Sequence, residues 1–256
     1  VGIAGFTRNN DALVFTQTQP PYVDAATGAV KGLVTLTYVN ASSCKECPDL
    51  MLVVQQLRSI LTVKGINVVD KDSPEGKALA GEYAMSRLPG ILVSSDVAEY
   101  TISRQLAATG TVKKDGSIAL GANPPYFNSS TGKVDGIAVL IMLNDSNCTE
   151  CYDVTIHIPV VKRGFQVYLG STNAVDISSA EGKELVSKYN ITSVPTILIT
   201  GDASVYARLA AIWGTVGTVE KDGTYVFRSM SAIAGSPYKN LLTGKVEQND
   251  AGAQVQ

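Results

Sequence analysis

The chain has 256 residues, a formal net charge of −2 and only 17% charged side chains. It contains no block of Lys or Arg, so nothing supports nucleic-acid binding or electrostatic membrane binding. No apolar run approaches the roughly 20 residues that a membrane span needs, and we expect no span in this chain. The first residue is Val1 rather than Met, and we expect that an upstream signal peptide or anchor has been removed.

In the first half of the chain, the apolar run from Leu33 to Val39 predicts a buried strand. Cys44-Lys45-Glu46-Cys47 follows it and precedes a helical stripe of apolar residues from Leu50 to Ile60. Pro74 marks a helix start, where its fixed φ is favourable. Pro89 leads into another apolar run, Ile91-Leu92-Val93. A strand that ends in Cys-x-x-Cys at a helix start is typical of a redox-active thiol pair.

The second half repeats this order of elements. Ile137 to Leu143 predicts a strand, and Cys148-Thr149-Glu150-Cys151 follows it. Further on we expect a helix over Tyr152 to Val161 that Pro159 kinks or ends, a strand over Gln166 to Leu169, a helix from the N-cap Ser179 to Tyr189, a strand after Pro195, a helix near Tyr206 to Trp213 and a hairpin at Asp222-Gly223.

The two halves are copies of one unit. Matched segments keep their order while their spacing drifts from 104 to 107 residues, as small loop insertions produce. We expect two homologous domains of about 105 residues, each large enough to bury a core. The matches are Pro20-Pro21-Tyr22 with Pro124-Pro125-Tyr126, Thr27-Gly28 with Thr131-Gly132, Glu75-Gly76-Lys77 with Glu181-Gly182-Lys183, Pro89 with Pro195, Asp96 with Asp202, Tyr100 with Tyr206, and Lys114-Asp115-Gly116 with Lys221-Asp222-Gly223.

Pieces of further repeats stand at both ends. Residues 237–246 repeat the opening pattern Pro-Tyr-x4-Thr-Gly-x-Val, and Asn10 to Phe15 resembles the close of a repeat. We therefore divide the chain into an N-terminal strand or cap segment (1–19), domain 1 (20–123), domain 2 (124–230) and a C-terminal hairpin and tail (231–256). The end pieces could cap the outer sheet edges or pair with neighbouring molecules in self-assembly through terminal strands. We favour capping, because repeat arrays need terminal caps.

Strand, Cys-x-x-Cys, helix, strand, helix and then Tyr189-Asn190-Ile191-Thr192-Ser193-Val194-Pro195-Thr196 resembles the thioredoxin fold. The tandem arrangement is similar to the archaeal-type protein disulfide oxidoreductases and, more loosely, to protein disulfide isomerase. The fold class expected is α/β, with two tandem thioredoxin-like domains. Each would have a central mixed sheet flanked by helices. The Pro-Tyr-x4-Thr-Gly-x-Val element, a β-hairpin at the repeat boundaries, is not part of the family pattern.

The resemblance implies the site residues Cys44, Cys47, Cys148, Cys151, Pro89 and Pro195. Cys44 and Cys148 would be nucleophiles at a helix N-terminus, which stabilises a thiolate. The second cysteine of each motif would resolve the mixed disulfide. The two prolines would be cis, face the cysteines, present a backbone edge to the incoming peptide and block metal capture. We expect protein thiols and disulfides as partners, no cofactor beyond the redox-active disulfides, and no metal.

Three features depart from the family pattern. Glu46 and Glu150 stand between the cysteines, where a carboxylate raises the pKa of a nearby thiol and predicts a weaker oxidant. Ser43 and Asn147 replace the aromatic residue that usually precedes the first cysteine. No acid in the first strand could relay protons, since Thr35, Thr37, Val139 and Ile141 occupy it. Asp49 and Asp153 match between copies and are expected to interact with the helix N-terminus.

Two functions remain open. We favour thiol–disulfide exchange on protein substrates, because a disulfide across so short a loop adds little stability. The alternative is a non-catalytic extracellular structural or assembly protein, of a surface or filament, with static disulfides. His157 has no counterpart in the first copy, so we expect a packed or surface side chain rather than a catalytic base, and Trp213 is expected to fill core space.

The paired cysteines also bear on location. Five Asn-x-Ser/Thr sequons occur, at Asn40, Asn128, Asn144, Asn147 and Asn190. Together with the cysteines they favour an extracytoplasmic glycoprotein, secreted or at the cell surface, where disulfides persist. We expect Asn147 and Asn190 to carry no glycan, because one lies beside the presumed active site and the other near a strand end.

Overall fold

The computed structural model describes residues 6–9, 12–15, 20–24, 26–233 and 235–248. The chain divides into unit 1, Val1–Lys133, and unit 2, Val134–Gln256. Strands β1 (Phe6–Asn9) and β2 (Ala12–Phe15) form an antiparallel pair near the N-terminus. Asn10 and Asp11, part of the segment that resembles the close of a repeat, lie outside the described residues. The domain boundaries expected from the sequence stay a prediction.

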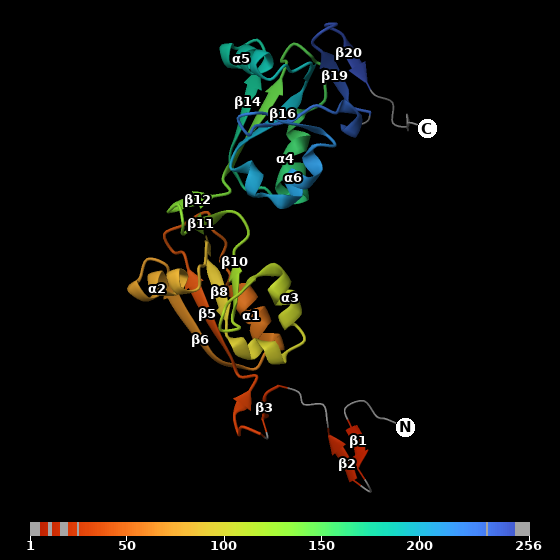
Figure 1. The fold of residues 1–256 in the computed structure, drawn as a ribbon. Coiled ribbons are helices and arrows are strands. Elements are labelled where there is room, and N and C mark those ends of the chain that lie inside the picture. Colours follow the sequence, from red (N-terminus) through yellow and green to blue (C-terminus); the bar gives the residue numbers. More distant parts are fainter. Residues whose placement is uncertain (1–5, 10–11, 16–19, 25, 234, 249–256) are drawn as a thin grey trace. The chain divides into compact units, whose positions relative to one another are not determined.

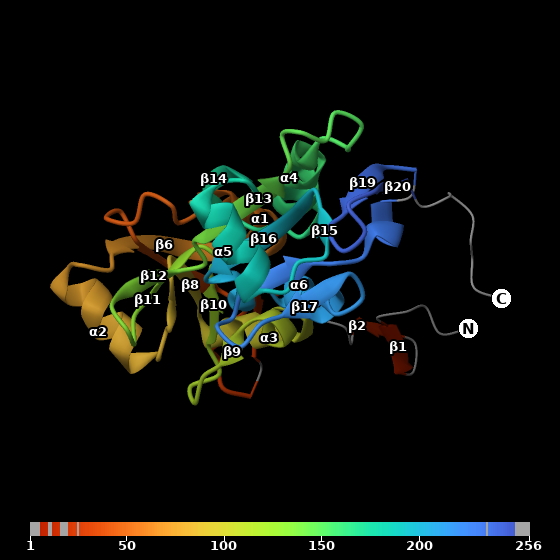
Figure 2. The same cartoon turned by 90° about the horizontal axis from the view of Figure 1, so that it is seen from above.

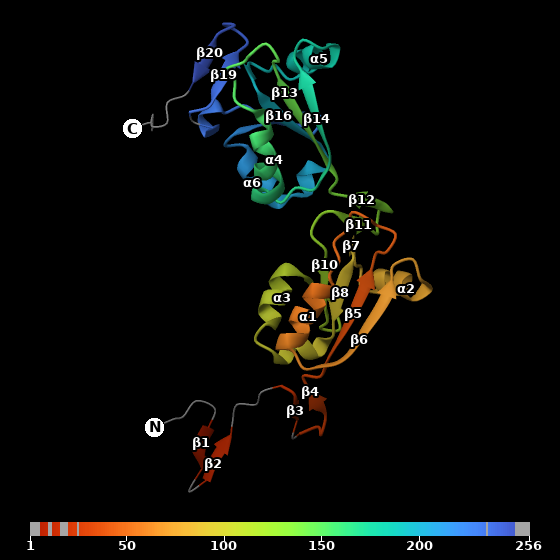
Figure 3. The same cartoon turned by 180° about the vertical axis from the view of Figure 1, so that it is seen from behind.

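Unit 1 contains a five-stranded sheet in the order β6-β5-β8-β10-β9. β5 (Val34–Asn40) runs parallel to β6 (Val63–Asp70) and antiparallel to β8 (Gly90–Val93). β10 (Ile118–Gly121) pairs antiparallel with β8 and with β9 (Thr111–Val112). Figures 1 and 3 show α1 (Met51–Ile60) and α3 (Ser103–Thr109) on one face of this sheet and α2 (Pro74–Glu82) on the other. A 3-10 turn over Ser95–Glu99 precedes α3.

Unit 2 has the same sheet, in the order β14-β13-β16-β18-β17. β13 (Ala138–Asn144) is parallel to β14 (Leu169–Asp176) and antiparallel to β16 (Thr196–Gly201), and β18 (Tyr225–Phe227) lies between β16 and β17 (Gly217–Val219). The helices are α4 (His157–Pro159), α5 (Ala180–Lys188) and α6 (Ala207–Trp213). Shorter 3-10 turns span Val154–Ile156, Ala203–Val205 and Met230–Ile233.

Each unit therefore has a parallel strand–helix–strand element followed by three strands that pair antiparallel, and a proline stands before the central strand, β8 or β16. This is the thioredoxin-like arrangement, so the expected fold class is confirmed: α/β, with two tandem units and added hairpins. Cores lie on both faces of the sheet in unit 2. Trp213 is fully buried in one of them, as expected.

The added element forms three hairpins of one design. They are β3 (Tyr22–Val23) with β4 (Val30–Lys31), β11 (Tyr126–Asn128) with β12 (Lys133–Asp135), and β19 (Pro237–Asn240) with β20 (Val246–Gln248). In each turn the side-chain oxygen of Asp24, Asn128 or Asn240 accepts hydrogen bonds from two backbone N–H groups ahead of it. The glycine of the repeated Thr-Gly pair has a φ near +70° in all three, which explains why glycine recurs there.

The second and third hairpins add a strand to a short edge. β11 pairs antiparallel with β7 (Arg87–Leu88), and β19 pairs antiparallel with β15 (Ser193–Val194). Figure 3 labels β7 beside β11, and Figure 2 shows β15 beside the β19–β20 hairpin. Each of these edges leads directly into the proline that precedes β8 or β16.

Two predicted elements in unit 2 need correction. The strand expected over Gln166 to Leu169 begins only at Leu169, because Gln166 has a φ of +58° that no strand accommodates. The helix expected over Tyr152 to Val161 starts at Val154 and is α-helical only over His157–Pro159. After Pro159 it continues as a π-helix over Val160–Gly164, so the proline ends the α-helix as expected.

The repeated Glu-Gly-Lys motif lies in the first turn of α2 and α5. The hydroxyl oxygens of the N-caps Ser73 and Ser179 accept hydrogen bonds from the N–H groups of Gly76 and Gly182, at 3.0 and 2.9 Å. A Cβ on Gly76 would lie 2.0 Å from the carbonyl oxygen of Asp70. Only glycine lets the capped helix approach the preceding strand this closely, so the motif recurs for a packing reason.

We predict that Gly76→Ala destabilises unit 1 by about 2 kcal/mol or more, because the backbone oxygen it meets cannot move aside. Gly81→Ala is the matched control in the same helix, since a Cβ there meets nothing within 4 Å. It should be neutral or stabilising by up to about 1 kcal/mol. Hydrogen exchange of the α2 and β6 amides measures both, and equal effects would contradict the close-packing explanation.

Candidate functional site

Both Cys-x-x-Cys motifs are closed disulfides. Cys44 is bonded to Cys47 and Cys148 to Cys151, with Cα atoms 5.4 Å apart in each pair. These bonds use all four cysteines of the chain. Each disulfide lies in the loop that follows the first parallel strand of its sheet, β5 or β13. Cys44 is buried and the other three are half-buried.

The prediction that each motif opens a helix is wrong. α1 begins only at Met51, and in unit 2 the first helical turn begins at Val154. Asp49 and Asp153 each accept a hydrogen bond from the backbone N–H two residues ahead, at 2.8 and 2.9 Å. Asp153 is the N-cap of its turn, whereas Asp49 stands one residue before the N-cap Leu50. Neither helix begins at a cysteine, and the nucleophile role of Cys44 and Cys148 stays a prediction.

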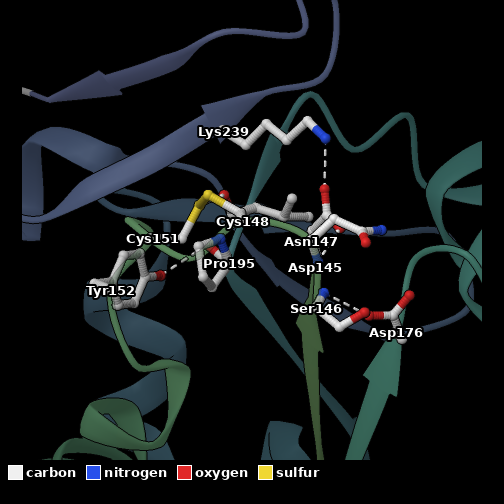
Figure 4. The surroundings of a disulfide bond; sticks show 10 residues. Asp145, Ser146, Asn147, Cys148, Cys151, Tyr152, Asp176, Pro195 and Lys239 are labelled. Atoms are coloured by element: carbon white, nitrogen blue, oxygen red, sulfur yellow. Dashed lines mark hydrogen bonds and ion pairs between the residues drawn. A yellow bond between two sulfur atoms is a disulfide. The ribbon is translucent and has the colours of Figure 1, made fainter.

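The prolines take the geometry that the resemblance implies. The Leu88–Pro89 and Val194–Pro195 peptide bonds are both cis. In unit 2 the Sγ atom of Cys151 lies 3.9 Å from the carbonyl oxygen of Val194, so the sulfur contacts the peptide that leads into Pro195. Figure 4 shows the disulfide beside the proline ring. The structure thus brings the predicted cysteines and proline of unit 2 together.

A tyrosine and a histidine lie next to Pro195. The hydroxyl of Tyr152 donates a hydrogen bond to the Pro195 carbonyl at 2.7 Å and lies 3.0 Å from Nε2 of His157, which leaves Nε2 as the donor of that contact. Burial lowers the pKa of His157 to about 4, so the ring is neutral at pH 7. It also packs against Phe227. His157 is a packed side chain, as expected.

The docked hairpin of unit 2 binds residues on both sides of the disulfide in sequence. The N–H of Tyr152, which follows Cys151, donates to the carbonyl of Pro237 in β19 at 2.8 Å. Lys239 of β19 donates to the carboxylate of Asp145 at 2.5 Å, and only 2% of the Asp145 side chain is exposed. This hydrogen bond with Lys239 lowers the pKa of Asp145. Figure 4 shows the pair beside the cysteines.

In unit 1 the residue that aligns with Lys239 is Phe127, and it makes a different contact. Phe127 of β11 lies opposite Leu88. The Nζ atom of Lys71 lies 3.9 Å from the centroid of the Phe127 ring, within the range of a cation–π interaction. Lys71 is itself buried and paired with Asp72 at 2.7 Å. Each hairpin is therefore held by backbone pairing and by one side-chain contact involving a charge.

An aspartate at the end of the neighbouring strand fixes the start of each cysteine loop. Asp70 accepts a hydrogen bond from the N–H of Ser42 at 3.0 Å, and Asp176 from that of Ser146 at 2.6 Å. Hydrogen bonds from Ser178 and Ser146 hold the pKa of Asp176 well below its usual range. The loop in unit 2 is thus tied to β14 through Asp176 and to β19 through Asp145 (Figure 4).

Sequence reasoning missed Tyr152, Asp145 and Lys239. The signal available for Tyr152 was its place directly after Cys151, where the first copy has Pro48. Asp145 and Lys239 lie 94 residues apart and belong to no shared motif. Glu46 is half-buried and Glu150 exposed, and their expected effect on the thiols stays a prediction.

Within the described residues, no three or more His, Cys, Asp or Glu side chains gather in a way that could hold a metal ion. None of the helices described has the length and apolar character that a membrane crossing requires.

No protein-family model and no curated protein matches this chain. Among solved structures, it is similar to the alkylhydroperoxide reductase subunit AhpF of Enterococcus faecalis at 19% identity, covering 67% of this chain and 83% of that one, with a TM-score of 0.22. A separate structure of an N-terminal part of AhpF gives 15% identity, 66% and 82% coverage and a TM-score of 0.19. A protein disulfide oxidoreductase from Aeropyrum pernix gives 16% identity, 67% and 78% coverage and a TM-score of 0.19.

We predict that Lys239→Met destabilises unit 2 by about 2 to 4 kcal/mol, because it leaves the buried Asp145 carboxylate without its cation. Lys188→Met is the matched control: Lys188 pairs with Asp222 at 2.8 Å, but both side chains are exposed. That change should cost less than about 1 kcal/mol. Fluorescence of Trp213, the one tryptophan of the chain, reports the unfolding of unit 2. A Lys239→Met cost as small as the control's would show that the pair does not hold the hairpin.

The same pair predicts an acid-sensitive unit. The pKa of Asp145 is lower in the folded chain than in the unfolded chain, where it is about 3.9. Its contribution to stability is therefore complete above about pH 4 and is lost as pH falls through the folded pKa. Trp213 unfolding curves should lose stability more steeply in this range for the wild type than for Asp145→Asn. Parallel pH profiles would contradict this assignment, since Asp176 and Asp222 remain in both proteins.

Proposed function

We propose that this chain is a non-catalytic structural subunit of an extracytoplasmic assembly, in which the two disulfides are static parts of docking sites for hairpins. One observation carries the proposal. In each unit, the short strand that leads into the cis-proline is already paired with a strand of the chain itself, β7 with β11 and β15 with β19.

The occupied edge is the one that an exchange enzyme would need. A thioredoxin-like oxidoreductase offers the backbone before its cis-proline to the incoming peptide, and a peptide adds there as an extra strand. β7 and β15 are only two residues long, and β11 and β19 already pair with them. A substrate would have to displace a hairpin held in unit 2 by the Lys239–Asp145 pair.

The location proposed follows from the chemistry of the cysteines. All of them are in disulfides, which persist in oxidising compartments and are reduced in the cytosol.

A second candidate function is thiol–disulfide exchange on protein substrates. The contact between Cys151 and the peptide before the cis-Pro195 favours it, since it places the disulfide beside the edge at which a substrate peptide would bind. On this reading the hairpin would be a lid that opens for the substrate.

Insulin reduction by dithiothreitol separates the two functions. We expect the chain to add nothing to the uncatalysed rate, with the Cys44→Ser/Cys148→Ser variant behaving identically. Turnover that the double variant loses would establish exchange and reject the structural role. A thioredoxin serves as positive control.

Reduction of the chain's own disulfides tests whether the hairpin protects them. Differential alkylation and mass spectrometry report Cys148–Cys151 and Cys44–Cys47 separately in one sample. We expect Lys239→Met to speed the reduction of Cys148–Cys151 roughly thirtyfold or more, because docking weakened by about 2 kcal/mol raises the undocked population by that factor. Cys44–Cys47 is the internal control and should not change. Equal acceleration of both would show global loosening instead of local exposure.

A further inference from the structure

The β3–β4 hairpin has the design of the two docked hairpins, but in the described part of the chain it has no third strand. Its turn has the same two hydrogen bonds to Asp24 and the same left-handed glycine, Gly28. The other two copies of this hairpin each pair with the strand before a cis-proline. Two of the three hairpins are therefore docked on the strand before a cis-proline. The third, β3–β4, has no such partner in the described residues.

Hydrogen bonds to the 3-10 turn before α3 and to the tyrosine that follows it fix the position of the β3–β4 hairpin on the rest of unit 1. The N–H of Gly32 donates to Asp96 at 3.1 Å, and the hydroxyl of Tyr100 donates to the carbonyl of Gly32 at 2.8 Å. Tyr22 in β3 donates to Glu99 at 2.7 Å. In unit 2 the Gly136 that follows β12 is held in the same way by Asp202 and Tyr206. A hairpin fixed in advance loses less conformational entropy when it docks.

The free hairpin exposes an apolar side chain at the position that makes the side-chain contact in both docked copies. This residue, Val23, is 63% exposed. The repeated pattern aligns Val23 with Phe127 and Lys239, the two residues that hold the docked hairpins in place. An exposed valine on an unpaired strand edge is suited to strand addition.

We propose that the β3–β4 hairpin docks on β15 of a second copy of this chain, where it replaces the β19–β20 hairpin of that copy. By the register of β19, Val23 would face Val194 and Asp24 would face Ser193. Each copy offers one donor hairpin and one acceptor edge, so the contact is head-to-tail and repeats. The proposal rests on the structural function above and names its partner.

Connectivity selects β15 rather than β7 as the acceptor. β19–β20 follows β18, the last strand of the unit 2 sheet in chain order, so its release leaves that sheet intact. β11–β12 stands between β10 and β13, and its release would pull on strands at both ends. The exchange therefore costs least at β15.

The Lys239–Asp145 pair sets the balance of this exchange. Val23 has no charge to offer Asp145, so the copy's own β19 has the advantage at β15. Loss of Lys239 removes the ion pair between β19 and Asp145, and Val23→Lys lets the incoming hairpin form that ion pair instead. The exchange can thus be directed by moving a single charge.

Sedimentation velocity across a concentration series tests the proposal on the full chain. Lys239→Ala should form head-to-tail oligomers with a dissociation constant at least tenfold below that of the wild type. Val23→Lys with Lys239→Ala should tighten it by a further tenfold, and Asp145→Asn should abolish this gain. Val23→Asp with Lys239→Ala should be monomeric. Val23→Lys alone leaves every residue of unit 2 unchanged and should also associate more tightly than the wild type.

Two results would overturn the proposal: no tightening by Val23→Lys, or oligomers of Lys239→Ala that Val23→Asp leaves intact. In the Val23→Lys/Lys239→Ala protein, a zero-length carbodiimide cross-link should join position 23 of one copy to Asp145 of another, and mixing isotopically light and heavy protein identifies the link as intermolecular. Insulin reduction is an independent readout. Activity there would reject the structural role, whereas Val23-independent association would reject only the docking site.

Discussion

The antiparallel pairing of a hairpin with the two-residue strand before the cis-proline is the contact on which the rest of the structure depends. Alone, β15 and the β19–β20 hairpin each bury little surface, because one has two residues and the other only two strands. Together β15, β19 and β20 form a three-stranded sheet beside the disulfide loop. The pairing also removes an open strand edge next to the sulfur atoms, and an open edge would recruit other chains. The pairing of β19 with β15 therefore completes this small sheet and closes the strand edge beside the disulfide in the same step.

The backbone pairing is the same in both units, whereas the side-chain contacts differ. Unit 1 places Phe127 under the Lys71 ammonium, and unit 2 places Lys239 against Asp145. Position 145 is aspartate where the first copy has Ala41, so a lysine-bearing hairpin would find no carboxylate there. Neither hairpin suits the other unit's site as well as its own. Differences of this kind give specificity between sites of identical shape.

Local patterns were enough to predict the repeat, the strands β5 and β13 and the Ser179 N-cap, since each depends on neighbouring residues. The cis bonds before Pro89 and Pro195 followed from the resemblance, whereas those before Pro21 and Pro125 were not predicted. The helix start was misjudged because Asp49 and Asp153 each bind a backbone N–H at the first turn, and Asp153 is the N-cap of its turn. Hairpin docking could not be predicted. Strands of two residues have no periodicity, and Lys239 and Asp145 meet across 94 residues.

The disulfides make more sense as geometric than as energetic devices. Cross-linking residues three apart in sequence removes little entropy from the unfolded chain, so each bond contributes little to global stability. The loop that Cys148–Cys151 closes begins three residues after Asp145 and ends beside Tyr152, which binds both β19 and Pro195. A bond that keeps this loop in one shape keeps both hairpin contacts in register. A static disulfide is therefore useful here because it fixes the shape of the loop to which the hairpin binds. The small entropic stabilisation from so short a cross-link does not argue against a structural role.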